Sequence, residues 1–566
     1  MTLKWRLYTI MGGLMVFLLS STMRLAELQI LEHAHWRERA EQIQVRQVTQ
    51  TKPRGAIRDR NGRPLAFDVR ATSIALDNYH MTKPELLEDL LMTHLGLSET
   101  EAEERIYRPS YFTWIARKTD PDTAEALRAD ADDQGVDGLL FVPEWTRAYP
   151  QGSLASNVIG FAGVDNEGLE GIELAYDHHL SGQSEKRSIV RGADGTVLEE
   201  RVLQQGKPGQ DLTLTIDSGI QRIAESAIQD GVKEYRAKGG FAIVADPVTG
   251  ELLAIAQDKT YDLNDFRRSA PAERTNLAAV QPFEPGSTFK PFAMLAALQG
   301  GAVRAGDEIN GDSPVKIAGH AINNAEYRSY GTISPSEVIE MSVNTGIVRI
   351  AEELGPERLH RFLTRMQFGR ETNLSLPGEV NGTLRPLEAW SKLSIGTIPI
   401  GQGMSVTGLQ LVRAYSAIAN GGWLQPLRLV QGAPTSPSPS DEGASRIAQP
   451  EHVAELTSMM EQVVHGDRGT GVYAQVNGFR IAGKSGTGQK ALPGQGYVDG
   501  KYTSLFAGFF PSDDPKYLVL VVYDEIQQRQ YYGGLTAAPT FKRIAAGIVD
   551  GAQLRPDPGR VEEGRE

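Results

Sequence analysis

Cysteine is absent from all 566 residues of the sequence. This absence excludes a thiol nucleophile, a disulfide framework and a thiolate metal site. Basic clusters are also lacking: the formal net charge is -13 and no long run of lysine or arginine occurs, so nucleic acid is not an expected partner. The paired histidines His178 and His179 have no third ligand at a suitable spacing, and we expect neither a metal ion nor an organic cofactor.

Long apolar runs are scarce, and one stands near the N-terminus. Residues Leu7–Met23 are apolar or small throughout, with two basic residues before them and one after. Extended over 7–26, this run is long enough to span a bilayer. A cleaved signal peptide is the alternative, but the run exceeds a usual signal core and no clear cleavage site follows it. We therefore predict a single-pass anchor in the cytoplasmic (inner) membrane, with 1–6 as a cytoplasmic end and the bulk outside.

The remaining chain is long enough for at least two domains. Residues 27–205 predict an α+β pedestal, with an Asn61-Gly62 hairpin turn and a helical pattern over Lys83–Asp133. After a Gly-Lys-Pro-Gly sequence, residues 206–552 predict an α/β domain with a central antiparallel sheet flanked by helices. Residues 553–566 are charged and contain proline and glycine, which favours a disordered tail.

Ser287 and Lys290 form the first candidate catalytic motif. They follow a Pro-Gly turn and precede an apolar helical pattern, so both side chains are expected on one face of a first helical turn, within hydrogen-bond reach. A desolvated lysine can accept the proton of a serine nucleophile. The spacing alone is a weak signal, because Ser313-x-x-Lys316 repeats it without a helical continuation. We interpret that second copy as coincidental.

Ser342-x-Asn344 is the second motif. Its hydroxyl could relay a proton to a leaving amine, and its amide could accept from a lysine while donating to a substrate. A helix N-cap is the alternative, because serine and asparagine favour that position for local reasons.

Lys484-Ser485-Gly486-Thr487 is the third motif, and it follows a strand pattern over Gly478–Lys484. An extended substrate could add to such a strand, while the lysine and the two hydroxyls bind a carboxylate. Gly486 would permit close backbone approach. The alternative is an ordinary strand end followed by a glycine turn.

Together and in this order, the three motifs are a signature of penicillin-binding proteins and class A β-lactamases. The sequence resembles the class B penicillin-binding proteins, membrane-anchored D,D-transpeptidases that cross-link peptidoglycan, over nearly its whole length. Phe283–Thr288 is most similar to the division-specific (septal) branch, and the elongation branch is the alternative. Gly408 stands where the family has proline, which leaves the catalytic motifs untouched. Further similar segments are Arg54–Ala66, Arg147–Pro150, Gly168–Glu173, Thr215–Asp217 and Gly401–Thr407.

The resemblance implies that a serine attacks the D-alanyl-D-alanine carbonyl of a stem peptide and that β-lactams acylate the same hydroxyl. It also implies a polytopic membrane glycosyltransferase and other division proteins as partners. A β-lactamase, a β-lactam-sensing receptor and a noncatalytic division scaffold are the competing hypotheses. The implied catalytic residues are Ser287, Lys290, Ser342, Asn344 and Lys484, and the implied substrate-binding residues are Ser485, Gly486 and Thr487.

Overall fold

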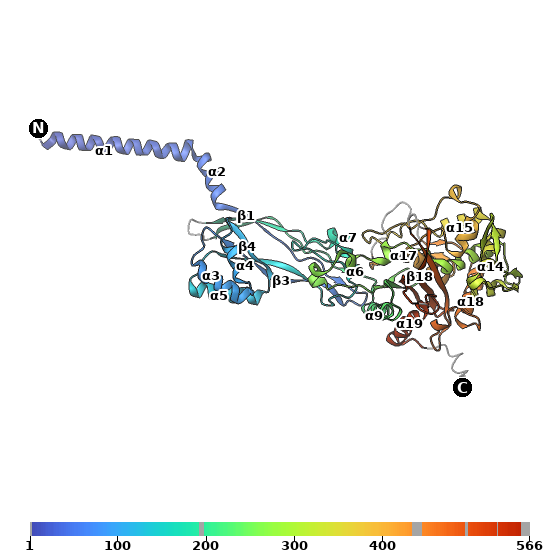
Figure 1. The fold of residues 1–566 in the computed structure, drawn as a ribbon. Coiled ribbons are helices and arrows are strands. Elements are labelled where there is room, and N and C mark those ends of the chain that lie inside the picture. The colour runs from blue at the N-terminus through green and yellow to red at the C-terminus, as the bar shows by residue number, and fades with distance from the viewer. Residues whose placement is uncertain (1–2, 192–196, 433–443, 493–495, 529, 556–566) are drawn as a thin grey trace. The chain divides into compact units, whose positions relative to one another are not determined.

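The computed structural model describes residues 3–191, 197–432, 444–492, 496–528 and 530–555 (Figure 1). By their internal contacts the residues form two compact units, which are considered separately. Unit 1 comprises Met1–Gly55, Asp68–Thr146 and Ser181–Gln210, and unit 2 comprises Ala56–Phe67, Arg147–Leu180 and Asp211–Glu566. The expected domain bounds, 27–205 and 206–552, stay a prediction. Most of the expected disordered tail, 556–566, lies outside the described residues.

The predicted N-terminal apolar helix is present as α1 (Leu3–Ala26), and a π-helical turn, Glu27–Leu31, continues it. Over the 28 residues of Lys4–Leu31 the rise is about 42 Å, which exceeds the hydrocarbon core of a bilayer. None of the apolar side chains in this span is buried by the protein. A single-pass anchor explains such an uncovered apolar helix.

Unit 1 is an α+β assembly, as predicted. One sheet has the order β1-β6-β7, and in a second sheet the C-terminal part of β3 pairs with β4 and β5. Three helices supply apolar side chains such as Leu87 and Leu127 to the core beside Ile74 and Leu76. The elements are β1 (Val45–Gln50), β3 (Pro64–Asp77), α3 (Pro84–Leu95), α4 (Glu99–Ile106), β4 (Phe112–Thr119), α5 (Pro121–Gln134), β5 (Leu139–Ala148), β6 (Glu185–Arg191) and β7 (Val197–Gln204).

The helical prediction over Lys83–Asp133 is wrong at one place, because strand β4 lies inside it. In β4 the buried Thr113 and Ile115 alternate with exposed Phe112 and Trp114, which is the period of a strand. The helical leucine spacing that suggested a continuous pattern ends at α3.

Unit 2 contains the predicted antiparallel sheet, with the strand order β10-β9-β19-β18-β17. Alternate residues of β19 face opposite sides: Leu518, Leu520 and Val522 join one apolar core, whereas Val519 and Val521 join another. Helix α17 covers the first face and the adjacent helices α9 and α19 cover the second (Figure 1). The elements are α9 (Ser218–Tyr235), β9 (Gly239–Ala245), β10 (Leu252–Gln257), α17 (Gly408–Ala419), β17 (Ala482–Leu492), β18 (Gly496–Phe510), β19 (Tyr517–Asp524) and α19 (Ala537–Ala552).

A helical layer of unit 2 carries the residues of the first two motifs. Helix α12 packs against α14, α15 and α18, and α18 in turn contacts the edge strand β17. The helices are α12 (Lys290–Gln299), α13 (Pro335–Glu340), α14 (Asn344–Leu354), α15 (Pro356–Arg365) and α18 (Pro450–His465). Shorter elements are β2 (Ile57–Arg58), α6 (Ser156–Ile159), α7 (Gly171–Ala175), α8 (Asp177–Leu180), β8 (Leu212–Thr213), α10 (Pro271–Arg274), α11 (Leu277–Val280), β11 (Ile309–Asn310), β12 (Val315–Ile317), β13 (His320–Ile322), β14 (Thr332–Ile333), α16 (Ser394–Thr397), β15 (Trp423–Leu424) and β16 (Ser445–Arg446).

The Asn61-Gly62 turn joins β2 to β3 as predicted, and Gly62 has a φ of 81°. Asp59, which is fully buried, accepts hydrogen bonds from the N–H groups of Asn61 and Arg63 and from Ser218 at the start of α9. These hydrogen bonds tie the charged turn to the start of α9.

Candidate active site

The three sequence motifs meet at one cavity of unit 2, with a volume of about 430 Å³. Its walls include the turn before α12, the junction of α13 and α14, strand β17 and the segment after β19. Lys290 and Lys484 are fully buried behind these lining residues. The predicted residues that line the cavity are Ser287, Ser342, Asn344, Ser485, Gly486 and Thr487.

Ser287 lies in a 3-10 turn, Gly286–Phe289, that leads directly into α12. Aromatic packing holds this turn: the ring of Phe289 lies 5.4 Å from that of Phe292 and 5.1 Å from that of Phe368. The buried Tyr415 hydroxyl donates to the carbonyl of Thr288 at 2.7 Å. The backbone around the hydroxyl is thereby fixed, while the Ser287 side chain remains open to the cavity.

The amine of Lys290 is bound to the second motif. Nζ donates to the Ser342 carbonyl (2.5 Å), to Ser342 Oγ (3.0 Å) and to Asn344 Oδ1 (2.7 Å). A protonated lysine has three N–H donors, and these contacts use all of them; the neutral amine has two and must release one of the three acceptors when it is formed. The expected hydrogen bond between Ser287 and Lys290 is therefore not among those of the described residues. Ser342 Oγ lies between the lysine and the cavity, where it can carry a proton.

Burial lowers the pKa of Lys290 well below its ordinary value, and the nearby charge of Lys484 lowers it further. Burial also lowers the pKa of Lys484, to about 7. Neither amine has a carboxylate partner within the described part of the chain. The site thus favours neutral amines, the form that accepts a proton.

Ser342 and Asn344 are not helix caps, so that alternative is wrong. The N-cap of α14 is Val343, and no side chain makes a capping hydrogen bond there. Ser342 has a φ of 60°, a left-handed conformation that costs about 1–3 kcal/mol in a residue other than glycine. The Asn344 amide also donates to the carbonyl of Asn323 at 2.9 Å, which fixes its orientation toward Lys290.

The third motif lies inside an edge strand, and not at a strand end. Strand β17 begins at Ala482, four residues after the predicted start, and continues to Leu492, and among the described strands it pairs with β18 alone. Its other edge can accept an extended peptide. Ser485 Oγ donates to Thr470 Oγ1 at 2.9 Å, and Thr487 Oγ1 accepts from the N–H of Gly533 at 3.2 Å.

Glycines bring three backbone segments into contact at the nucleophile. Gly286 has a φ of 53°, and a Cβ added there would lie 2.5 Å from the Thr487 carbonyl oxygen. A Cβ on Gly486 would lie 2.6 Å from Thr288 Cγ2. The N–H of Gly286 also donates to the Gly401 carbonyl at 3.1 Å. These contacts set the spacing between Ser287 and the edge strand.

Thr470 and Glu284 were not predicted from the sequence. Thr470 lines the cavity, holds Ser485 and donates its N–H to the Glu340 carbonyl at 3.3 Å. The only sequence feature that marks Thr470 is a glycine on either side of it. Glu284, three residues before Ser287, accepts from the N–H of Gly403 at 2.9 Å and from the hydroxyl of Tyr497 at 3.1 Å.

The second Ser-x-x-Lys match stands apart from the cavity lining. Ser313 Oγ donates to Asn323 Oδ1 at 3.3 Å and accepts from the N–H of Asn324 at 3.2 Å, whereas Lys316 is exposed in β12. Among the described residues, no three histidine or acidic side chains form a group that could hold a metal ion.

Comparison with known families gives two matches that together cover most of the chain. The family described as Penicillin binding protein transpeptidase domain matches residues 240–546, and the Penicillin-binding Protein dimerisation domain matches residues 49–214.

Curated relatives match along almost their whole length. The probable peptidoglycan D,D-transpeptidase PbpC of Pseudomonas aeruginosa is 32% identical, over 94% of this chain and 93% of that protein. The peptidoglycan D,D-transpeptidase FtsI of Escherichia coli K12 is 30% identical, over 98% of this chain and 93% of that protein.

Solved structures give the same result. Penicillin binding protein 3 of Mycobacterium tuberculosis, in complex with aztreonam, superposes with a TM-score of 0.70 at 27% identity, over 90% of this chain and 98% of that one. The chain therefore belongs to the class B penicillin-binding proteins, the peptidoglycan D,D-transpeptidases that combine a dimerisation domain with a penicillin-binding transpeptidase domain.

Proposed function

We propose that this chain cross-links peptidoglycan through an acyl-enzyme on Ser287, with Lys290 as the base. The observation that carries the assignment is the fully buried Lys290 amine, which has no acidic partner among the described residues and is hydrogen-bonded to Ser342 beside the Ser287 cavity. A neutral lysine in this position accepts the serine proton directly or through Ser342 Oγ.

In the acylation step, Ser287 Oγ attacks the carbonyl of the penultimate D-alanine while its proton passes to Lys290. The N–H groups of Ser287 and Thr487 hold the oxyanion of the tetrahedral intermediate, and losing one such donor costs about 3 kcal/mol. The C–N bond then breaks, and the departing D-alanine receives a proton through Ser342 and Lys484.

Recognition of the donor peptide falls to strand β17 and to Asn344. The peptide adds along the open edge of β17, Ser485 and Thr487 bind its terminal carboxylate, and Asn344 orients its amide. Gly486 lets β17 lie directly against the turn that carries Ser287, since a side chain there would strike Thr288. An amine of a second stem peptide finally attacks the acyl-enzyme, which forms the cross-link and frees Ser287. β-Lactams acylate the same serine because they present the same carbonyl and carboxylate.

The cellular setting follows from the anchor and the family. The N-terminus lies in the cytoplasm and the bulk lies on the extracytoplasmic side of the inner membrane, because the basic residues precede the apolar helix. Similarity to FtsI and to penicillin binding protein 3 favours septal wall synthesis over elongation. The partners are a polytopic membrane glycosyltransferase and other division proteins.

Each competing function has a requirement of its own, and within the described residues one helix is long and apolar enough to span a membrane. A β-lactamase needs a dedicated base for the deacylating water, and a β-lactam-sensing receptor needs several membrane spans and a cytoplasmic effector domain. A noncatalytic scaffold requires no reactive serine.

The test is labelling with fluorescent penicillin followed by mapping of the acylated peptide. Wild type should carry a long-lived label on Ser287, Ser287→Ala should carry none, and the matched control Ser313→Ala should label as wild type. A label on Ser313, or rapid repeated turnover of the penicillin, would overturn the assignment. A Ser287→Ala chain that cross-links at the wild-type level would leave only the scaffold.

A further inference from the structure

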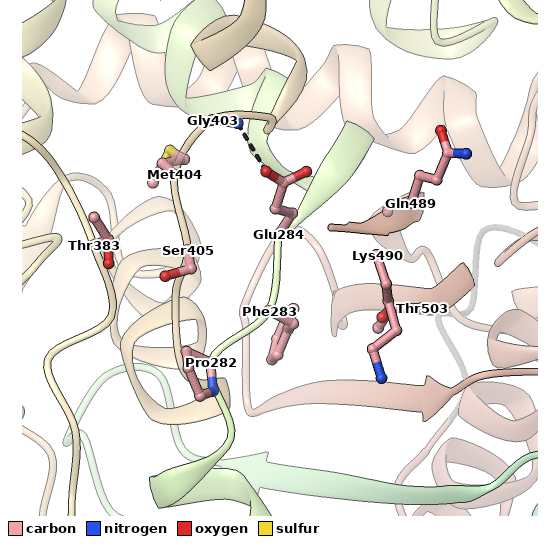
Figure 2. Close-up of a pocket in the computed structure, with 11 residues that line it drawn as sticks. Pro282, Phe283, Glu284, Thr383, Gly403, Met404, Ser405, Gln489, Lys490 and Thr503 are labelled. Carbon is pink, nitrogen blue, oxygen red and sulfur yellow. Dashed lines mark hydrogen bonds between the residues drawn. The ribbon is translucent and has the colours of Figure 1, made fainter. Parts of the chain in front are cut away.

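A second cavity of unit 2, with a volume of about 310 Å³, lies beside the nucleophile turn. Phe283 and Glu284 line it on one side, and Gln489 of strand β17 lies on another (Figure 2). Gly488 of the same strand also belongs to its lining. The two cavities are therefore lined by nearby residues of the same two segments, with Glu284 and Ser287 on one and Gly488 and Thr487 on the other. Where they meet, the backbones touch: a Cβ on Gly488 would lie 2.4 Å from the Glu284 carbonyl oxygen.

The carboxylate of Glu284 is held in place at this second cavity. Its oxygens accept hydrogen bonds from the N–H of Gly403 (2.9 Å) and the hydroxyl of Tyr497 (3.1 Å to each oxygen). Both donors are neutral at ordinary pH, since the pKa of Tyr497 is raised to about 12 by its burial and by Glu284. These bonds orient the carboxylate without cancelling its charge.

A cation is missing from the arrangement. Within the described residues Glu284 forms no ion pair, and partial burial raises the pKa of its carboxyl. Lys490 also lines the cavity, but its amine pairs with Asp524 and Glu525, at 2.8 Å each, and points away from Glu284 (Figure 2). A partly buried, oriented and uncompensated carboxylate is suited to a ligand that brings its own positive charge.

The distance to the reaction centre suits a peptide ligand. Ser287 lies three positions after Glu284, so their backbones lie within about 11 Å, the reach of about three extended residues. In the proposed binding mode, a stem peptide that continues along β17 beyond Thr487 would run toward Gly488 and Gln489, which line the Glu284 cavity. Stem peptides that form amide cross-links must contain a primary amine.

We propose that Glu284 and the cavity around it form a subsite for the primary ammonium group of a stem peptide. This inference rests on the proposed function. The ammonium can belong to the acceptor strand, whose amine attacks the acyl-enzyme, or to the side chain of the donor peptide. In either case Glu284 contacts the ligand cation, while Gly403 and Tyr497 act as positioning residues.

The test compares wild type, Glu284→Gln and the control Glu352→Gln, which removes the same charge from an exposed position of α14. The donor arm uses peptides that end in D-alanyl-D-alanine and contain a lysine whose amine is free or acetylated. Preference for the free amine, as the ratio of kcat/KM values for D-alanine release, should be about tenfold in wild type and Glu352→Gln and should vanish in Glu284→Gln.

The acceptor arm uses the acetylated donor with a lysine-containing acceptor peptide. The ratio of amide product to hydrolysis should fall about tenfold in Glu284→Gln and stay unchanged in Glu352→Gln. A fall in this arm alone assigns the subsite to the acceptor, and a loss of preference in the donor arm alone assigns it to the donor. Unchanged ratios in both arms would overturn the proposal.

These readouts separate the possible failures. A purely structural role of Glu284 would slow the free and acetylated donors equally and would leave both ratios intact. If Glu284→Gln does not fold, the preference of wild type for the free amine is measured at low and at high salt. High salt should weaken this preference if it depends on charge, and an unchanged preference would overturn the proposal. Penicillin labelling of wild-type Ser287 is independent of this subsite, so its loss would count against the proposed function and not against Glu284 alone.

Discussion

Replacement of Asn344 by aspartate offers the sharpest test of Lys290 as the base. Asn344 Oδ1 lies 2.7 Å from Lys290 Nζ. Asparagine and aspartate have the same shape, so Asn344→Asp places a carboxylate oxygen against the buried amine. An opposite charge at such a distance raises the pKa of a lysine by about 1–3 units.

The sign of the effect follows from the role of the base. Lys290 accepts a proton only when neutral, and the neutral fraction below the pKa falls tenfold for each unit by which the pKa rises. Acylation on the acid limb of the pH profile should therefore slow by about 10- to 1000-fold, and the limb should move by about 1–3 units to higher pH. Raising the pH by the same amount should restore this part of the loss.

The assay is the second-order rate of acylation by fluorescent penicillin, measured from acid to alkaline pH and read on denaturing gels. Asn344→Ala is the control, because it removes the acceptor of the Lys290 hydrogen bond without adding charge. Its rate should fall, but its acid limb should not move to higher pH. If Asn344→Asp is slower by the same factor at every pH, titration of Lys290 does not govern acylation.

Two further predictions concern stability and backbone geometry. Lys484→Met should abolish acylation yet raise the melting temperature below pH 7. The fold lowers the pKa of Lys484 from 10.5 to about 7, so burial of the charged amine destabilises the wild type fully below pH 7. This destabilisation disappears as the pH rises toward 10.5. A melting temperature that is lower than wild type at every pH would contradict this reasoning. Gly286→Ala should lose acylation and more than about 2 kcal/mol of stability, because it combines a φ of 53° with a 2.5 Å contact to Thr487. Gly301→Ala is the control, because Gly301 has a φ of 66° and open space around it; it should lose only about 1–2 kcal/mol in thermal melts and keep its penicillin labelling. Equal losses of stability in the two variants would show that the contact between residue 286 and Thr487 does not matter.

The sequence was most informative where chemistry depends on short spacings. The three motifs predicted the cavity around Ser287 because each lies on a short local element: a helical turn, the break between α13 and α14, and a strand. The partner of Lys290 could not be predicted in the same way. Spacing places Ser287 near the lysine, but the three donors are taken by Ser342 and Asn344 across 52 and 54 residues. Which acceptor a buried amine selects is decided by tertiary packing.

The residues that were missed share this dependence on distant contacts. Thr470 holds Ser485 from a loop without helical or strand periodicity, and the partners of Glu284 lie 119 and 213 residues away. Strand β4 was missed for a different reason, because its eight residues, of which only the first four alternate in burial, lie between helices whose leucine spacing dominates the pattern. Sequence periodicity identifies an element only when that element is long enough to outweigh its neighbours.

The two buried amines have a consequence for the order of the reaction. Lys290 and Lys484 have no acidic partner among the described residues, so in the proposed mechanism the terminal carboxylate of the donor peptide is the negative charge that comes near them. That carboxylate departs with D-alanine. The acyl-enzyme then has one negative charge fewer, and a proton on either lysine becomes less favourable. The acceptor amine must lose a proton as it attacks. It arrives at the stage when Lys290 and Lys484 are least protonated and can best accept that proton. The change in charge at the site thus favours attack by the acceptor amine after D-alanine has left the donor peptide.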